Sequence, residues 1–134
     1  MMNNPARFYR QMSCQGASRV GLVVILYEVA MGCLHRAVKA LEANNIEART
    51  RELNHFLAVI GYLHASLDMA RGGEVARALD RFYHIARVRI LQANLAQSKA
   101  GLEEIAAHFN TLREAWEQVD RSVGSSFPQP ETEK

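Results

Sequence analysis

Apolar residues recur every three or four positions through four long stretches of the chain, which is the spacing of one buried face of an α-helix. The first stretch follows Ser18, a residue type favoured at helix N-caps, and we expect it to run to about Ala43. The β-branched run at residues 23–25 favours a strand, but the helical spacing continues over six positions and outweighs it. The predicted core stripe consists of Val23, Leu26, Ala30, Cys33, Ala37 and Leu41.

The second stretch begins at Asn44, which forms a capping pair with Glu47 three residues later. Its predicted core stripe consists of Ile46, Leu53, Leu57, Ile60 and Leu67. We expect this helix to end at Gly72 and Gly73, because one glycine can adopt φ > 0 as a helix stop while the next opens a new helix. A connection this short predicts two antiparallel neighbouring helices.

The third predicted helix runs from about Glu74 to Ala96, and the fourth follows Ser98 as its N-cap. The core stripe of the third helix consists of Val75, Leu79, Phe82, Ala86, Ile90 and Ala93. The stripe of the fourth keeps a strict alternation of three and four, as in a coiled-coil seam, and consists of Leu102, Ile105, Phe109, Leu112, Trp116 and Val119.

Composition supports an all-α fold in a single domain. The chain has 134 residues, 49% of them hydrophobic, and its three prolines lie close to its ends. We therefore predict an antiparallel up-down four-helix bundle over residues 18–121, with a short additional N-terminal helical segment over residues 1–17. The glycine, serine and proline content of residues 122–134 predicts a disordered tail.

Three of the predicted helices carry a second apolar stripe, which a surface helix of a bundle does not need. This surplus is expected to be covered by a thick core, by the N-terminal segment with Tyr9, by another subunit, or by foreign helices in surface grooves. The candidate partner-binding residues are Tyr9 in the N-terminal segment, Leu22, Ile25 and Val29 on the first helix, Phe56, Val59, Tyr62 and Leu63 on the second, and Ile85, Val88, Leu91 and Leu95 on the third.

Catalysis and cofactor binding are not indicated. Cys14 and Cys33 fit no metal or redox spacing, and we expect them to be free thiols in a reducing cytosol, since no signal peptide precedes them. Glu52 and His55 match the Glu-x-x-His motif of di-iron bundles, but that chemistry needs two such motifs and two further glutamates. No phosphate-binding loop is present. We therefore predict no enzyme activity, no cofactor and no metal.

Nucleic acid and membrane are not expected partners either. The net charge is only +2, and Asp80 interrupts a basic side of the third helix that consists of Arg77, Arg81, His84 and Arg87. The most apolar run, residues 20–34, contains Glu28 and falls short of the 18 or more uncharged residues of a typical membrane span. A nucleic-acid-binding or metal-binding helical bundle stays open as an alternative.

From about Phe8 to Val119 the chain resembles a known family, the flagellar secretion chaperones or FliS proteins. The resemblance rests on the joint order of short motifs, which are Tyr9 with Gln11, Ala17-Ser18, Leu26-Tyr27, Leu67-Asp68 before Gly72-Gly73-Glu74-Val75-Ala76, Ala93-Asn94, and Leu112-Arg113-Glu114 before Trp116. The chain departs from the family pattern at Arg19, at Glu28 and around Tyr83. Residues expected to serve the structure are Ser18, Leu67, Asp68, Gly72, Gly73, Asn94 and Trp116.

The resemblance implies a cytosolic, non-enzymatic chaperone. Such a protein binds the C-terminal region of flagellin, prevents its premature polymerisation and delivers it to the flagellar type III export apparatus. The partner is expected to wrap the bundle as helical segments in surface grooves, and the N-terminal segment can occupy one groove when the partner is absent. Docking to the export gate, and a monomer or weak homodimer, are further expectations.

Overall fold

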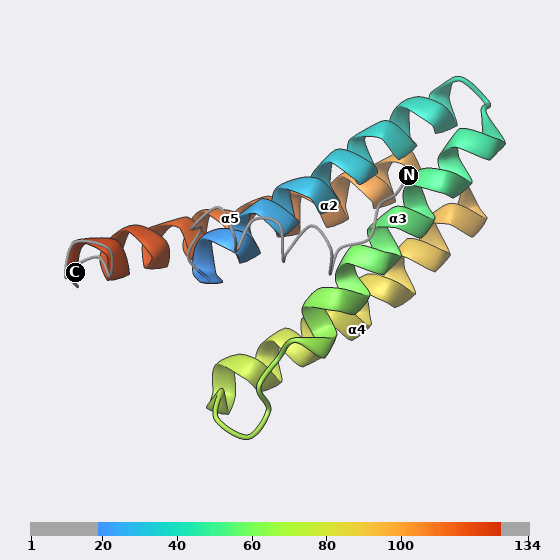
Figure 1. Ribbon diagram of the computed structural model, residues 1–134. Helices are drawn as coiled ribbons and strands as arrows, with labels where there is room; N and C mark the ends of the chain where they lie inside the picture. Colours follow the sequence, from blue (N-terminus) through green and yellow to red (C-terminus); the bar gives the residue numbers. More distant parts are fainter. Residues whose placement is uncertain (1–18, 127–134) are drawn as a thin grey trace.

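The computed structural model describes the backbone of residues 19–126 and the side chains of residues 19–122. This part of the chain contains no strand and forms four helices, which are α2 (Arg19–Glu42), α3 (Ile46–Ala65), α4 (Gly73–Ala96) and α5 (Lys99–Ser126). Consecutive helices run in opposite directions (Figure 1). The predicted all-α four-helix fold is confirmed, whereas the predicted N-terminal helical segment lies outside the described residues.

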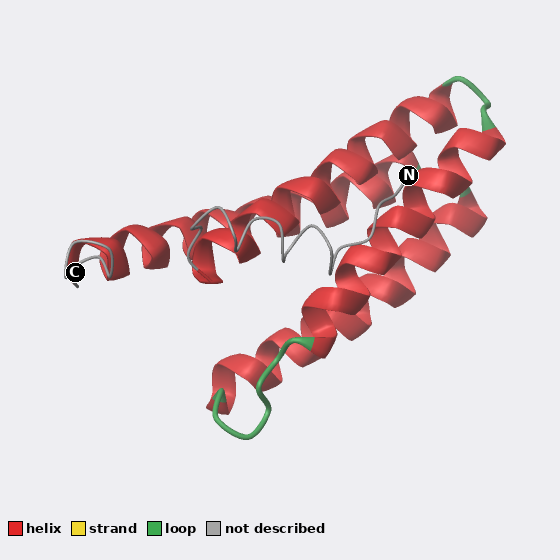
Figure 2. Ribbon diagram, in the orientation of Figure 1, coloured by secondary structure: helices red, strands yellow, loops and turns green. Residues whose placement is uncertain are grey.

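The four helices form two arms that converge at one end of the molecule and diverge at the other (Figure 1). One arm consists of α2 and α5 and the other of α3 and α4, with the short connections at the ends (Figure 2). The arms meet near the α2–α3 turn and splay apart toward the α3–α4 loop. Apolar side chains at the splayed end, such as Val23, Leu67 and Trp116, pack on the core but stay only half-buried.

Aromatic side chains from all four helices fill the centre of the core. The ring of Phe109 lies 5.2 Å from Tyr27, 5.4 Å from Phe56 and 5.0 Å from Phe82, measured between ring centroids. The hydroxyls of Tyr27 and Tyr83 are 2.7 Å apart and both side chains are buried, so that each phenol satisfies the other. Burial raises the pKa of both phenols. This contact joins the two arms where they diverge.

Local chemistry explains the α2–α3 turn and the start of α5. The side chain of Asn45 caps α3, since its Oδ1 accepts a hydrogen bond of 3.0 Å from the backbone N–H of Ala48. The prediction of Asn44 as the cap is wrong by one residue, because Asn44 adopts a left-handed conformation with φ of 56° after α2. The predicted cap of α5 is confirmed, because Ser98 Oγ accepts a 2.9 Å bond from the N–H of Gly101.

The α3–α4 connection is longer than predicted. α3 ends at Ala65, and the glycine pair opens α4 instead of ending α3. Asp68 organises the loop, since its carboxylate accepts a bond from the N–H of Arg71 and its carbonyl accepts one from Gly72. A Cβ on Gly72 would lie 2.5 Å from the Cβ of Ala76, and Gly73 has φ of +60°, so both positions require glycine.

Some predicted core residues lie at the ends of helices and are exposed. Ile46 and Val75 are 65% and 63% exposed, and Val119 is 44% exposed, so their assignment to the core was wrong. α5 also continues past Arg121, the predicted end of the bundle, to Ser126.

By length and composition, α2 qualifies as a helix that could cross a membrane, although Glu28 interrupts its most apolar run. Its apolar window is 44% buried inside the bundle, and α2 packs against both α3 and α5. The core helix of a soluble protein meets the same criteria. The packing therefore assigns α2 to the core of the bundle.

Candidate binding surface

Exposed large apolar side chains in the described part of the chain gather on α4. Its inward face, which includes Leu79, Tyr83 and Ile90, is buried in the core. Its outward face exposes four residues that the sequence analysis proposed as partner contacts. These are Ile85 (51% exposed), Val88 (53%), Leu91 (56%) and Leu95 (86%). α4 is thus apolar on two faces, and one of them has no cover within residues 19–122.

Three of these side chains continue a regular row along α4, which we call the α4 row. It consists of Arg77, Arg81, His84, Val88, Leu91 and Leu95, all of them exposed. The spacing alternates strictly between four and three residues, so the members lie on one side of the helix, as in a coiled-coil seam. The N-terminal half of the row is basic and the C-terminal half is apolar.

Four proposed contact residues lie elsewhere than the sequence analysis placed them. Leu22, Phe56, Val59 and Leu63 are 1%, 0%, 1% and 3% exposed, so they belong to the core and not to a surface stripe. The three residues on α3 are buried because α3 packs against both α2 and α4, and Leu22 is buried because α2 packs against both α3 and α5. In this conformation these four side chains are not accessible to a partner.

The remaining proposed contacts have intermediate positions or lie outside the described residues. Ile25, Val29 and Tyr62 are half-buried, and the last two pack against the core. Tyr9 lies outside the described residues, and so does Ser18, which was expected to serve the structure and not the partner. The structure therefore brings together the candidates on α4 and leaves those on α2 and α3 mostly inside.

A cleft of about 480 Å³ opens between the arms at the splayed end of the molecule. The cleft is lined by several residues that were expected to serve the structure and by two proposed partner contacts. The former are Leu67, Asp68, Gly72 and Trp116, and the latter are Tyr62 and Leu63. Asn94 stands apart from it, with its Oδ1 buried and lacking a hydrogen-bond partner. The cleft is lined mainly by apolar side chains, so it offers a second place for an apolar group.

Ile85 belongs to a different surface from the α4 row. It lines a groove of about 210 Å³ between α4 and α5, together with Phe82, Arg89, Glu104 and His108. Arg89 Nη1 lies 3.9 Å from Glu104 Oε2 across this groove. The outward face of α4 thus offers apolar contacts on both of its sides.

A polar network fastens α4 to α3 beside the α4 row. His64 Nε2 lies 2.6 Å from Asp80 Oδ1, and Arg87 Nη1 lies 2.8 Å from His64 Nδ1. Because arginine can only donate, Nδ1 must accept, and the ring proton on Nε2 is then donated to Asp80. This hydrogen bond is the main reason that the pKa of Asp80 is lowered. Asp80 is therefore engaged by α3, and the same carboxylate oxygen also lies 3.9 Å from Nε2 of His84 in the row.

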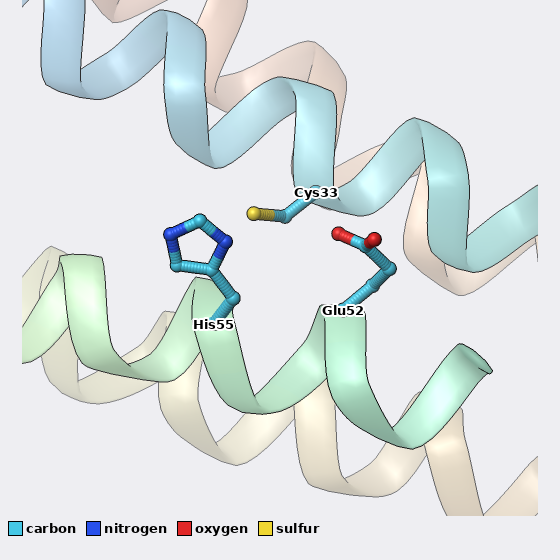
Figure 3. A group of neighbouring side chains, drawn as sticks. All are labelled: Cys33, Glu52 and His55. Atoms are coloured by element: carbon cyan, nitrogen blue, oxygen red, sulfur yellow. The ribbon is translucent and has the colours of Figure 1, made fainter. Parts of the chain in front are cut away.

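A second polar cluster lies between α2 and α3 and was not foreseen. Figure 3 shows Cys33 on α2 facing Glu52 and His55 on α3. Cys33 is fully buried, and burial, followed by the charge of Glu52, raises the pKa of its thiol to about 11. Burial also lowers the pKa of His55. The only sequence signals were the motif at residues 52 and 55 and a cysteine on the core stripe of another helix.

The comparisons with known proteins agree on one family. The sequence model of the flagellar protein FliS family matches residues 1–123. The flagellar secretion chaperone FliS of Salmonella typhimurium is 33% identical over 116 residues, which cover 83% of this chain and 86% of that protein. The flagellar secretion chaperone FliS of Bacillus subtilis is 26% identical over 121 residues, 90% of each chain. FliSB of Pseudomonas aeruginosa is 28% identical over 115 residues, 83% of this chain and 91% of that protein.

Proposed function

The chain belongs to the FliS family of flagellar secretion chaperones, and from this premise we propose that it binds the C-terminal region of flagellin in the cytoplasm. It thereby prevents premature polymerisation and delivers flagellin to the flagellar type III export apparatus. Proteins of this family are chaperones and not enzymes. No catalytic role is accordingly assigned to the polar clusters.

The observation that carries this proposal is the α4 row. An exposed row with alternating spacing of four and three residues matches the apolar face of another amphipathic helix, which can lay its own side chains between those of Val88, Leu91 and Leu95. Exposed large apolar side chains that gather on one surface mark a site for contact with another protein. The row therefore fits a helical partner segment better than a small molecule or an extended peptide.

The charge of the row adds an orientation to the proposal. Arg77 and Arg81 are exposed at its N-terminal half, where they attract carboxylates, and the apolar half follows. We expect the bound flagellin helix to place acidic residues beside Arg77 and Arg81 and apolar residues beside Leu91 and Leu95.

A chaperone that uses this surface needs no chemical step. The C-terminal flagellin segment has no partner helix while the subunit is free, and an isolated amphipathic helix is marginal in water. When the segment folds onto α4, its apolar face is covered and is unavailable to other flagellin subunits. Release at the export gate frees that face again. We expect the free chaperone to be a monomer or a weak homodimer that docks on the export gate.

Co-purification with flagellin tests the proposal. We expect the tagged chaperone to retain full-length flagellin from the same bacterium and to lose flagellin that lacks its C-terminal segment, because that segment supplies the helix for α4. Flagellin that lacks its N-terminal segment is the matched control and should still be retained. Equal retention of the C-terminally truncated protein, or no retention of the intact one, would contradict the proposal.

A further inference from the structure

Three side chains of different chemistry meet between α2 and α3. One ligand atom from each of Cys33, Glu52 and His55 lies within 4.8 Å of the other two. Glu52 and His55 are three residues apart and so project from the same side of α3, while Cys33 faces them from α2. Figure 3 shows the ring of His55 with one nitrogen turned toward the Cys33 sulfur. The cluster belongs to neither the α4 row nor the cleft.

We propose that Cys33, Glu52 and His55 form a site for a divalent transition metal ion, with zinc as the best match. Sulfur, carboxylate oxygen and imidazole nitrogen are the three ligand types that zinc takes in proteins, and three protein ligands leave a fourth position open. The harder ions magnesium and calcium disfavour the thiolate and imidazole. The thiol proton leaves to solvent when the metal–sulfur bond forms.

The cluster already requires a positive charge. Glu52 Oε1 is buried and lacks a hydrogen-bond partner, and a buried carboxylate without compensation is costly. The guanidinium of Arg36 provides part of this positive charge. Its Nε lies 3.1 Å from Glu52 Oε1, but the two atoms do not have the geometry of a hydrogen bond. Its Nη2 also donates a long 3.8 Å hydrogen bond to Cys33 Sγ. A metal ion would bond both atoms directly.

Arg36 can leave the cluster without unfolding the bundle. Its side chain is 55% exposed, whereas that of Glu52 is 15% exposed. The guanidinium therefore competes with the metal ion from the solvent side and can swing outward when the ion enters. Arg36 controls access to the site, and its removal should favour the metal.

A second group of potential metal ligands, which contains two histidines, is less suited to bind a metal ion. His64, Asp80 and His84 are equally close to one another. The bond from Arg87 fixes His64 Nδ1 as the acceptor, so the proton lies on Nε2, the atom that would have to bind the ion. Within the described residues, no arginine donates a hydrogen bond to the ring of His55. Its ring nitrogen can therefore offer a lone pair to a metal ion.

Titration of the metal-free full chain with cobalt(II), followed by competition with zinc(II), tests the proposal. We expect one equivalent to bind with a thiolate-to-cobalt charge-transfer band. His55→Gln should weaken cobalt binding by more than about 10-fold. Loss of a residue that only hydrogen-bonds to a metal ligand already costs about that much affinity, and His55 would bind the metal itself. Cys33→Ser should remove the band. Cys14→Ser, which alters the other cysteine, is the matched control and should keep the band and the affinity.

Arg36→Ala separates a metal site from a merely structural cluster. Because it removes a competing cation, we expect it to tighten cobalt binding by about 10-fold. If the cluster had only a structural role, the loss of this ion pair would not tighten cobalt binding. Absence of the band in the wild type, a band that survives in both Cys33→Ser and His55→Gln, or weaker binding by Arg36→Ala would each overturn the proposal. His55 is half-buried, so its variant stays informative if Cys33→Ser fails to fold.

Discussion

The substitution Val59→Asp is expected to destabilise the protein severely. Val59 is 1% exposed and lies in the core on α3, so an aspartate there would be a buried charge without a partner. A buried uncompensated charge costs about 3 to 5 kcal/mol, a large part of the roughly 5 to 15 kcal/mol that stabilises a typical domain. Thermal unfolding followed by circular dichroism should show a greatly lowered midpoint or no transition.

The matched control is Val88→Asp, the same change on the exposed side of α4. Val88 is 53% exposed, so the new carboxylate stays in water and the unfolding midpoint should remain close to that of the wild type. If Val59→Asp instead melted like the wild type, Val59 would face a groove, as the sequence analysis expected, and the packing of α3 described above would be wrong.

The second large effect concerns binding. The double substitution Val88→Asp with Leu91→Asp should weaken the binding of the C-terminal flagellin segment by more than about 100-fold, since two central apolar contacts at about 2 kcal/mol each are lost. Both positions are exposed, so the fold should be retained. Isothermal titration calorimetry measures the affinity, and circular dichroism confirms the helix content.

Val119→Asp controls for charge and for apolar exposure. Val119 is also exposed, at 44%, but it lies on α5, near the end opposite to Leu91 along the bundle. We expect it to leave the affinity unchanged. Equal losses from Val119→Asp and from the double variant would indicate a general effect of negative charge instead of a specific surface on α4.

The helices themselves followed from the sequence because each carries a clear apolar period. Ser98 before a strict alternation of apolar positions gave the start of α5, and the long proline-free middle gave the fold class. The exact cap of α3 did not follow. Two adjacent asparagines, Asn44 and Asn45, are equally suited to a left-handed turn and to capping, and only the geometry of the turn separates these roles.

The surface was only partly predictable for a different reason. The second stripes of α3 and α4 look alike in sequence, yet Val59 is buried and Val88 is exposed. Which stripe finds a neighbour depends on how the two arms sit together, and periodicity within one helix carries no information about that. The clusters around His64 and Cys33 were missed because each joins side chains from two helices.

The most direct measurement is photo-crosslinking from α4. A photo-reactive residue in place of Leu91, which is 56% exposed, should crosslink to flagellin, and mass spectrometry should map the product to the C-terminal segment. The same residue in place of Val119 should give little product. The claim that α4 holds this segment is supported if the crosslink is specific to position 91. Crosslinks that map elsewhere in flagellin, or that form equally from position 119, would contradict it.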